Sequence, residues 1–193
     1  MTVIDRSSLV TYLNDHLAGS IAALELMERI SSSHAGTPLG VTMAGLVDEI
    51  GKEQTLIRSL VGAVGGSEST LAKSLAWLGE KVARIKIGPG EGDPSGLMLF
   101  EALEALSIGF WGRRSLWRAL DHLGLQRSLD VDADFAGLAR RAEQHLGNLE
   151  VFRLEASRSA LMETEPVVTG RARLDDAIEK SLPASDAPST RIA

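Results

Sequence analysis

The chain has 193 residues, the length of about one domain, and its 26 acidic and 20 basic residues give a formal net charge of −6. With 44% hydrophobic and 24% charged residues, the composition is that of a globular protein and excludes a wholly disordered chain. Cysteine is absent, which excludes disulfide scaffolds, thiolate zinc sites, iron–sulfur clusters and cysteine nucleophiles.

Apolar residues recur at intervals of three and four along most of the chain, the spacing that lines one face of a helix. Aromatic residues make up only 4% and few stretches alternate with period two, so a sheet is not expected. The pattern predicts five helices, over about residues 5–32, 38–64, 68–87, 94–124 and 132–164.

Capping residues and glycines set the predicted boundaries of these helices. Thr37 supplies an N-cap oxygen for the second helix, and the proline after it suits the first helical position. Gly109 and Gly112 are expected to bend or divide the fourth helix. Asp130 and Asp132 are the expected caps of the fifth.

Short connections between these helices predict antiparallel neighbours and hence an all-α, up-and-down helical bundle. We expect one bundle domain over residues 1–165. Residues 166–193 change to a Pro-, Ser- and Ala-rich composition, which predicts a mobile tail that could hold one short amphipathic helix.

Carboxylates and imidazoles on an apolar stripe are the candidates for chemistry, because burying them is costly unless they are paired or bound to a metal. Glu53 falls in line with the apolar stripe of the second helix, and Glu49 lies one turn earlier. The pair favours either a metal or proton site, or the edge of the stripe, solvated or bridged by Lys52 and Arg58. His145 is predicted to face inward on the fifth helix.

A carboxylate-bridged dimetal centre in a bundle needs Glu-x-x-His on two of its helices, and this chain contains no such motif. What remains is a single metal site at Glu25, Glu49, Glu53 and His145. Iron or manganese would suit these oxygen and imidazole ligands. The sequence gives no catalytic residues.

Aromatic residues and arginines interleave over residues 110–118, which raises the question of nucleic-acid binding. Since the chain is acidic overall, we expect no nucleic-acid partner. The three arginines are instead predicted to pair across the bundle or to stack on tryptophans, the candidate partners being Glu80, Glu101, Glu104, Trp111 and Trp117.

Several segments resemble a group of small bacterial proteins with a ferritin-like bundle, over about residues 8–162. The segments are YLNDHLAG (12–19), ALEL (23–26), WLGEKVARIK (77–86) and LWRAL (116–120). The resemblance implies a four-helix core plus one accessory helix, which would be the helix at 68–87 or the second half of that at 94–124. Ferritin-like proteins often bind two irons through Glu and Glu-x-x-His ligands, and this chain lacks both histidine positions.

Two functional hypotheses follow from these features. The first is a non-catalytic bundle protein, without cofactor, that associates as a homodimer or with another protein, with Leu26, Ile30, Leu56 and Trp77 as the predicted dimer face. The second is a carboxylate bundle that binds Fe or Mn in oxidative stress or hydroxylation. We expect a cytoplasmic protein with no membrane contact, because the sequence shows no signal pattern and no apolar run of about 18 residues.

Overall fold

The computed structural model describes residues 4–66 and 96–162, and its helices belong to one compact unit, Met1–Met162. No described residue lies in a strand, so the predicted all-α fold class is confirmed. The predicted helix at 68–87 and the predicted tail at 166–193 lie outside the described residues. The helices are α1 (Arg6–Ser33), α2 (Pro38–Ala63), α4 (Leu97–His122), α5 (Leu125–Ser128) and α6 (Phe135–Leu161).

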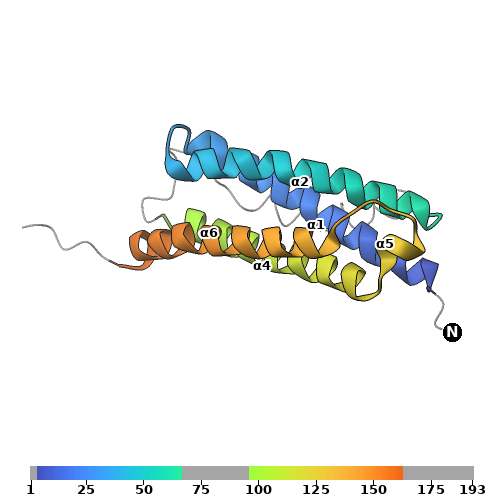
Figure 1. The fold of residues 1–193 in the computed structure, drawn as a ribbon. Helices are drawn as coiled ribbons and strands as arrows, with labels where there is room; N and C mark the ends of the chain where they lie inside the picture. The colour runs from blue at the N-terminus through green and yellow to red at the C-terminus, as the bar shows by residue number, and fades with distance from the viewer. Residues whose placement is uncertain (1–3, 67–95, 163–193) are drawn as a thin grey trace, which may run out of the picture. The chain divides into compact units, whose positions relative to one another are not determined.

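The four long helices form two antiparallel pairs, α1 with α2 and α4 with α6, and α1 also packs against α4 (Figure 1). Helices α2 and α4 run in the same direction. The second half of α4 places Leu116, Trp117 and Leu120 in the core.

The first two helices start at side-chain caps, Asp5 and Thr37, of which the sequence predicted Thr37. The side chain of Asp5 accepts hydrogen bonds from the hydroxyl and the backbone amide of Ser8, which together hold the pKa of Asp5 below its usual value. Thr37 accepts from the Gly40 amide at 3.2 Å, as the sequence predicts. Glycine is needed at position 40, because a Cβ there would collide with the carbonyl oxygen of His34. The tight α1–α2 connection therefore depends on this residue.

Two predicted boundaries are wrong. Helix α4 is not divided at Gly109 or Gly112, since apolar packing on its inner face outweighs the roughly 1 kcal/mol that each glycine costs a helix. Helix α6 is capped by Asp134 rather than by Asp130 or Asp132: its carboxylate accepts from the amide of Gly137 at 2.7 Å. Asp130 has a left-handed backbone conformation with φ of 52°, whereas an N-cap residue ordinarily has an extended backbone.

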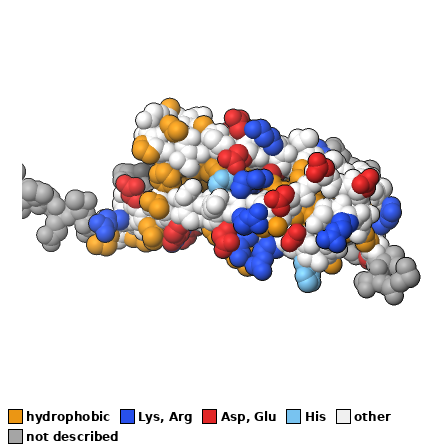
Figure 2. All heavy atoms as spheres, in the orientation of Figure 1, with side chains coloured by type: hydrophobic (Ala, Val, Ile, Leu, Met, Phe, Trp, Pro, Cys, Tyr) orange, Lys and Arg blue, Asp and Glu red, His pale blue; other side chains and the backbone are white. Residues whose placement is uncertain are grey.

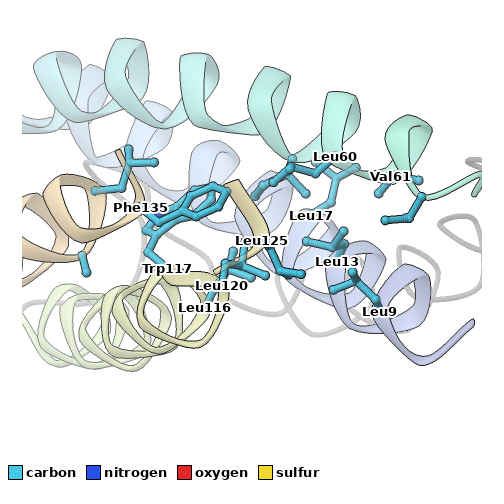
Figure 3. Packing of buried hydrophobic residues seen from close by; sticks show 14 of the residues in the cluster. Leu9, Leu13, Leu17, Leu60, Val61, Leu116, Trp117, Leu120, Leu125 and Phe135 are labelled. Atoms are coloured by element: carbon cyan, nitrogen blue, oxygen red, sulfur yellow. The ribbon is translucent and has the colours of Figure 1, made fainter. Parts of the chain in front are cut away.

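The apolar interior is divided into two clusters along the bundle. The first contains Trp117 and Phe135, whose rings stack with centroids 5.8 Å apart, together with leucines of α1, α2 and α4 (Figure 3). The second gathers residues nearer the α1–α2 connection, including Met27, Met43 and Leu103. Glu53, Arg113 and His145 lie between the two clusters.

Candidate functional site

Three helices contribute polar side chains to the interior at the level between the two apolar clusters. They are Glu53 from α2, Arg113 from α4 and His145 from α6, here called the polar layer. Glu53 lies between Ile50, which belongs to one cluster, and Ile57, which belongs to the other. The apolar stripe of α2 thus carries a charged residue, Glu53, at a position where an aliphatic residue would make the two clusters continuous.

Glu53 and Arg113 form a two-pronged ion pair with little access to water. The Nε of Arg113 donates to Oε2 of Glu53 at 2.6 Å, and its Nη2 donates to Oε1. The indole Nε1 of Trp117 also donates to Oε2, at 2.9 Å. The side chains are only 9% and 11% exposed, for Glu53 and Arg113 respectively. Both carboxylate oxygens are thus occupied, which offsets the cost of burying the charge.

His145 extends this network to the protein surface. Its Nδ1 lies 3.1 Å from Nη1 of Arg113, and its Nε2 lies 3.4 Å from Oε2 of Glu49. Because arginine can only donate, Nδ1 must accept, which leaves the ring proton on Nε2, facing Glu49. Burial, together with the neighbouring Arg113 charge, lowers the pKa of His145, against an opposing effect of Glu49 and Glu53. The ring is therefore neutral at pH 7.

The structure brings together three of the four predicted metal ligands. Glu49, Glu53 and His145 belong to the same network, whereas Glu25 is exposed on α1 and lines a shallow pocket with Glu28 and other α1 residues. Within residues 4–66 and 96–162, no group of three or more His, Asp or Glu side chains is arranged to hold a metal ion. A guanidinium lies between Glu53 and His145 instead.

The residues as placed therefore do not fit a ferritin-type metal centre. Both oxygens of Glu53 accept hydrogen bonds from nitrogen donors, and Nδ1 of His145 accepts one from Arg113. An ion at this level would have to displace the Arg113 side chain, which carries the positive charge that a metal would otherwise supply.

Sequence reasoning identified the buried carboxylate and missed its partners. Neither Lys52 nor Arg58 is the cation that pairs with Glu53; Arg113 is. The signal was present, because Arg113 lies three residues after Phe110 and four before Trp117, both on the buried stripe of α4. The Phe110 ring lies under the Arg113 guanidinium, with its centroid 5.5 Å from Cζ of Arg113. The same ring packs edge-on against the ring of His145.

The other predicted arginine partners also change. Arg114 pairs with Glu143 on α6, at 3.3 Å, and not with the glutamates expected from the sequence. Glu104 pairs instead with Arg153, also at 3.3 Å. Glu80 lies outside the described residues. Two of the arginines in the aromatic segment thus bind carboxylates within the bundle.

Comparisons with protein-family models, with curated proteins and with solved structures find no match to this chain. Over the described ranges, no helix is both long enough and apolar enough to cross a membrane.

Proposed function

We propose that this chain is a non-catalytic helical-bundle protein of the ferritin-like class, which acts in the cytoplasm through contact with a second copy of itself or with another protein. The helix directions support this class, since two antiparallel pairs with α2 and α4 parallel are what a ferritin-like bundle has. The mutual pairing of Glu53, Arg113 and His145 supports a structural use of the polar layer.

The observation that carries the proposal is the exposed apolar surface of α4 and α6. Ile108 and Trp111, one turn apart on α4, are 74% and 59% exposed. Val151, Leu154 and Leu161 are exposed on α6, the helix that packs against α4. Figure 2 shows hydrophobic side chains mainly toward the end of the face where α6 finishes, and charged ones over its middle. Tryptophan and large aliphatic side chains left in water favour a protein interface.

This surface is not the dimer face predicted from the sequence. Leu26 and Ile30 are buried inside the bundle, with 3% and 0% exposure, so they cannot contact a second copy. Leu56 is partly buried against the first apolar cluster, and Trp77 lies outside the described residues. We therefore propose the exposed apolar residues of α4 and α6 as the interface.

Two valines of nearly equal exposure provide a matched test. Val151→Glu places a charge on the α6 surface, and Val41→Glu places the same charge on α2, the two valines being 65% and 67% exposed. We expect the native protein to sediment as a dimer at micromolar concentration, Val151→Glu to be monomeric, and Val41→Glu to remain a dimer. A native protein that is monomeric throughout this range would contradict self-association.

A second candidate function rests on the convergence of Glu49, Glu53 and His145. It is a carboxylate bundle that binds Fe or Mn, in oxidative stress or hydroxylation, and it requires Arg113 to leave the polar layer. Elemental analysis of protein purified without chelators tests it. Near-stoichiometric iron or manganese that is lost in Glu53→Ala would support this function, and metal-free protein of full thermal stability would reject it.

A further inference from the structure

A cavity of about 170 Å³ lies beside the polar layer, lined by residues of α1, α2 and α4. Most of its wall is apolar, with Met27, Ile50, Ile57, Phe110 and Leu116 among the lining residues. An apolar cavity of about 150 Å³ is large enough to hold a benzene ring. The space therefore suits a molecule with a single ring.

Glycines keep this space open on two of the helices. A Cβ added at Gly19 or Gly109 would meet nothing within 4 Å, and one at Gly112 would meet only Cε1 of His16, at 4.0 Å. All three glycines are inside helices, where glycine is less favourable than alanine. Larger side chains could be accommodated at these positions, and their absence leaves the cavity unfilled.

Gln54 gives the cavity wall an unused hydrogen-bond donor. Its side chain lines the cavity, is only 6% exposed, and its Nε2 has no hydrogen-bond partner among the described residues. A buried amide donor without an acceptor is costly. An acceptor brought by a bound molecule would remove this cost.

The charges around the cavity favour an uncharged occupant. Glu53 and Arg113 both line it, but their charges neutralise each other in the ion pair. Burial lowers the pKa of His16, against an opposing effect of Asp15, so this ring is neutral at pH 7. A charged occupant would therefore find no unpaired buried charge among the described residues that line the cavity.

We propose that this cavity binds an uncharged small molecule with one ring and a carbonyl oxygen that accepts a hydrogen bond from the amide of Gln54. The ring lies against Phe110, Ile50 and Leu116, and the oxygen points to α2. This site is separate from the exposed α4–α6 surface, and binding here does not depend on self-association.

Three compounds of similar size test the proposal by titration calorimetry on the full-length protein. Acetophenone has the ring and the carbonyl, ethylbenzene lacks the acceptor, and benzoate carries a charge. We expect acetophenone to bind about tenfold more tightly than ethylbenzene, because only acetophenone satisfies the Gln54 donor. We expect benzoate to bind most weakly of the three. The side-chain amide signal of Gln54 in a ¹⁵N–¹H spectrum should shift with acetophenone.

Two variants and a control assign the binding to this cavity. Gln54→Leu should abolish the preference for acetophenone while ethylbenzene still binds. Gly112→Leu, which extends toward His16, should weaken both compounds at least tenfold, and Gly45→Leu, at an exposed glycine of α2, should bind as the native protein does. Helical circular dichroism checks that each variant is folded.

The proposal is overturned by any of three results: no saturable binding of acetophenone, equal affinity for acetophenone and ethylbenzene, or full binding by folded Gly112→Leu. Sedimentation of the same samples keeps this outcome distinct from the proposed association. Loss of acetophenone binding would leave a dimer unchanged, and a monomeric protein would leave the cavity intact.

Discussion

The buried pair of Glu53 and Arg113 provides the sharpest test of the interior. Glu53→Leu leaves a guanidinium, 11% exposed, without its carboxylate, and it also removes the acceptor of the Trp117 indole. Arg113→Met leaves a buried carboxylate to which, among the described residues, Trp117 alone still donates a hydrogen bond. Breaking a buried ion pair from one side costs about 3 to 5 kcal/mol, so each single variant should lose at least that much.

The double variant should be more stable than the single losses suggest. With both charges gone, the remaining cost is mainly the Trp117 donor without an acceptor, about 1 to 3 kcal/mol. The double-mutant cycle should therefore give a coupling energy of at least about 3 kcal/mol. Urea denaturation followed by circular dichroism measures the four free energies of unfolding.

A neighbouring pair serves as the control for this cycle. Arg114 and Glu143 join α4 to α6, whereas Glu53 and Arg113 join α2 to α4, and the side chains of Arg114 and Glu143 are 23% and 62% exposed. The same substitutions, Arg114→Met and Glu143→Leu, should give a coupling energy below about 1 kcal/mol, because water screens an exposed pair. Additive losses at Glu53 and Arg113, within about 0.5 kcal/mol, would refute the buried pairing described above.

Three further outcomes are expected. Since burial lowers the folded-state pKa of His145 below its ordinary 6.5, the unfolded chain binds the proton more readily. The free energy of unfolding should thus fall as pH drops below about 6.5. His145→Gln should reduce this dependence of stability on pH, measured by denaturation curves from pH 7.5 to 5. An unchanged pH dependence in the variant would contradict the lowered pKa of His145. Asn14 is fully buried and its amide has no hydrogen-bond partner among the described residues, so Asn14→Leu should raise the free energy of unfolding by about 1 to 3 kcal/mol. The control Asn148→Leu, at an exposed position, should change the free energy of unfolding by less than about 0.5 kcal/mol. A destabilised Asn14→Leu would show that the Asn14 amide is hydrogen-bonded in the folded protein. Asp134→Ala should lower the midpoint of thermal unfolding with a loss of about 1 kcal/mol, whereas equal losses in Asp134→Ala and Asp132→Ala would argue against Asp134 as the cap.

The helices could be predicted because each has a continuous apolar stripe, and their ends could be predicted where one cap candidate stood alone, as at Thr37. Where several candidates stood close together, the choice depended on packing. Asp134 caps α6 because Phe135, the next residue, stacks on Trp117 and fixes where the helix begins.

The candidate site was only half predictable for a related reason. The stripe of α2 shows that Glu53 faces inward, since that depends on the period of a single helix. Its partner depends on how α4 is rotated and shifted against α2, which no local pattern specifies. Arg113 is 60 residues away in the chain and was grouped with its aromatic neighbours instead.

The polar layer has one consequence that an aliphatic layer would lack. Shifting α4 by one turn, about 5.4 Å, would still bury leucines against leucines, because apolar contacts between stripes tolerate many registers. The same shift would take the guanidinium of Arg113 away from Glu53 and His145 and leave the buried charges of Glu53 and Arg113 unpaired, at several kcal/mol. Only one register satisfies all of them. The ion pair therefore selects how α2, α4 and α6 align, and this alignment positions the cavity wall that Gln54 and Phe110 form beside it.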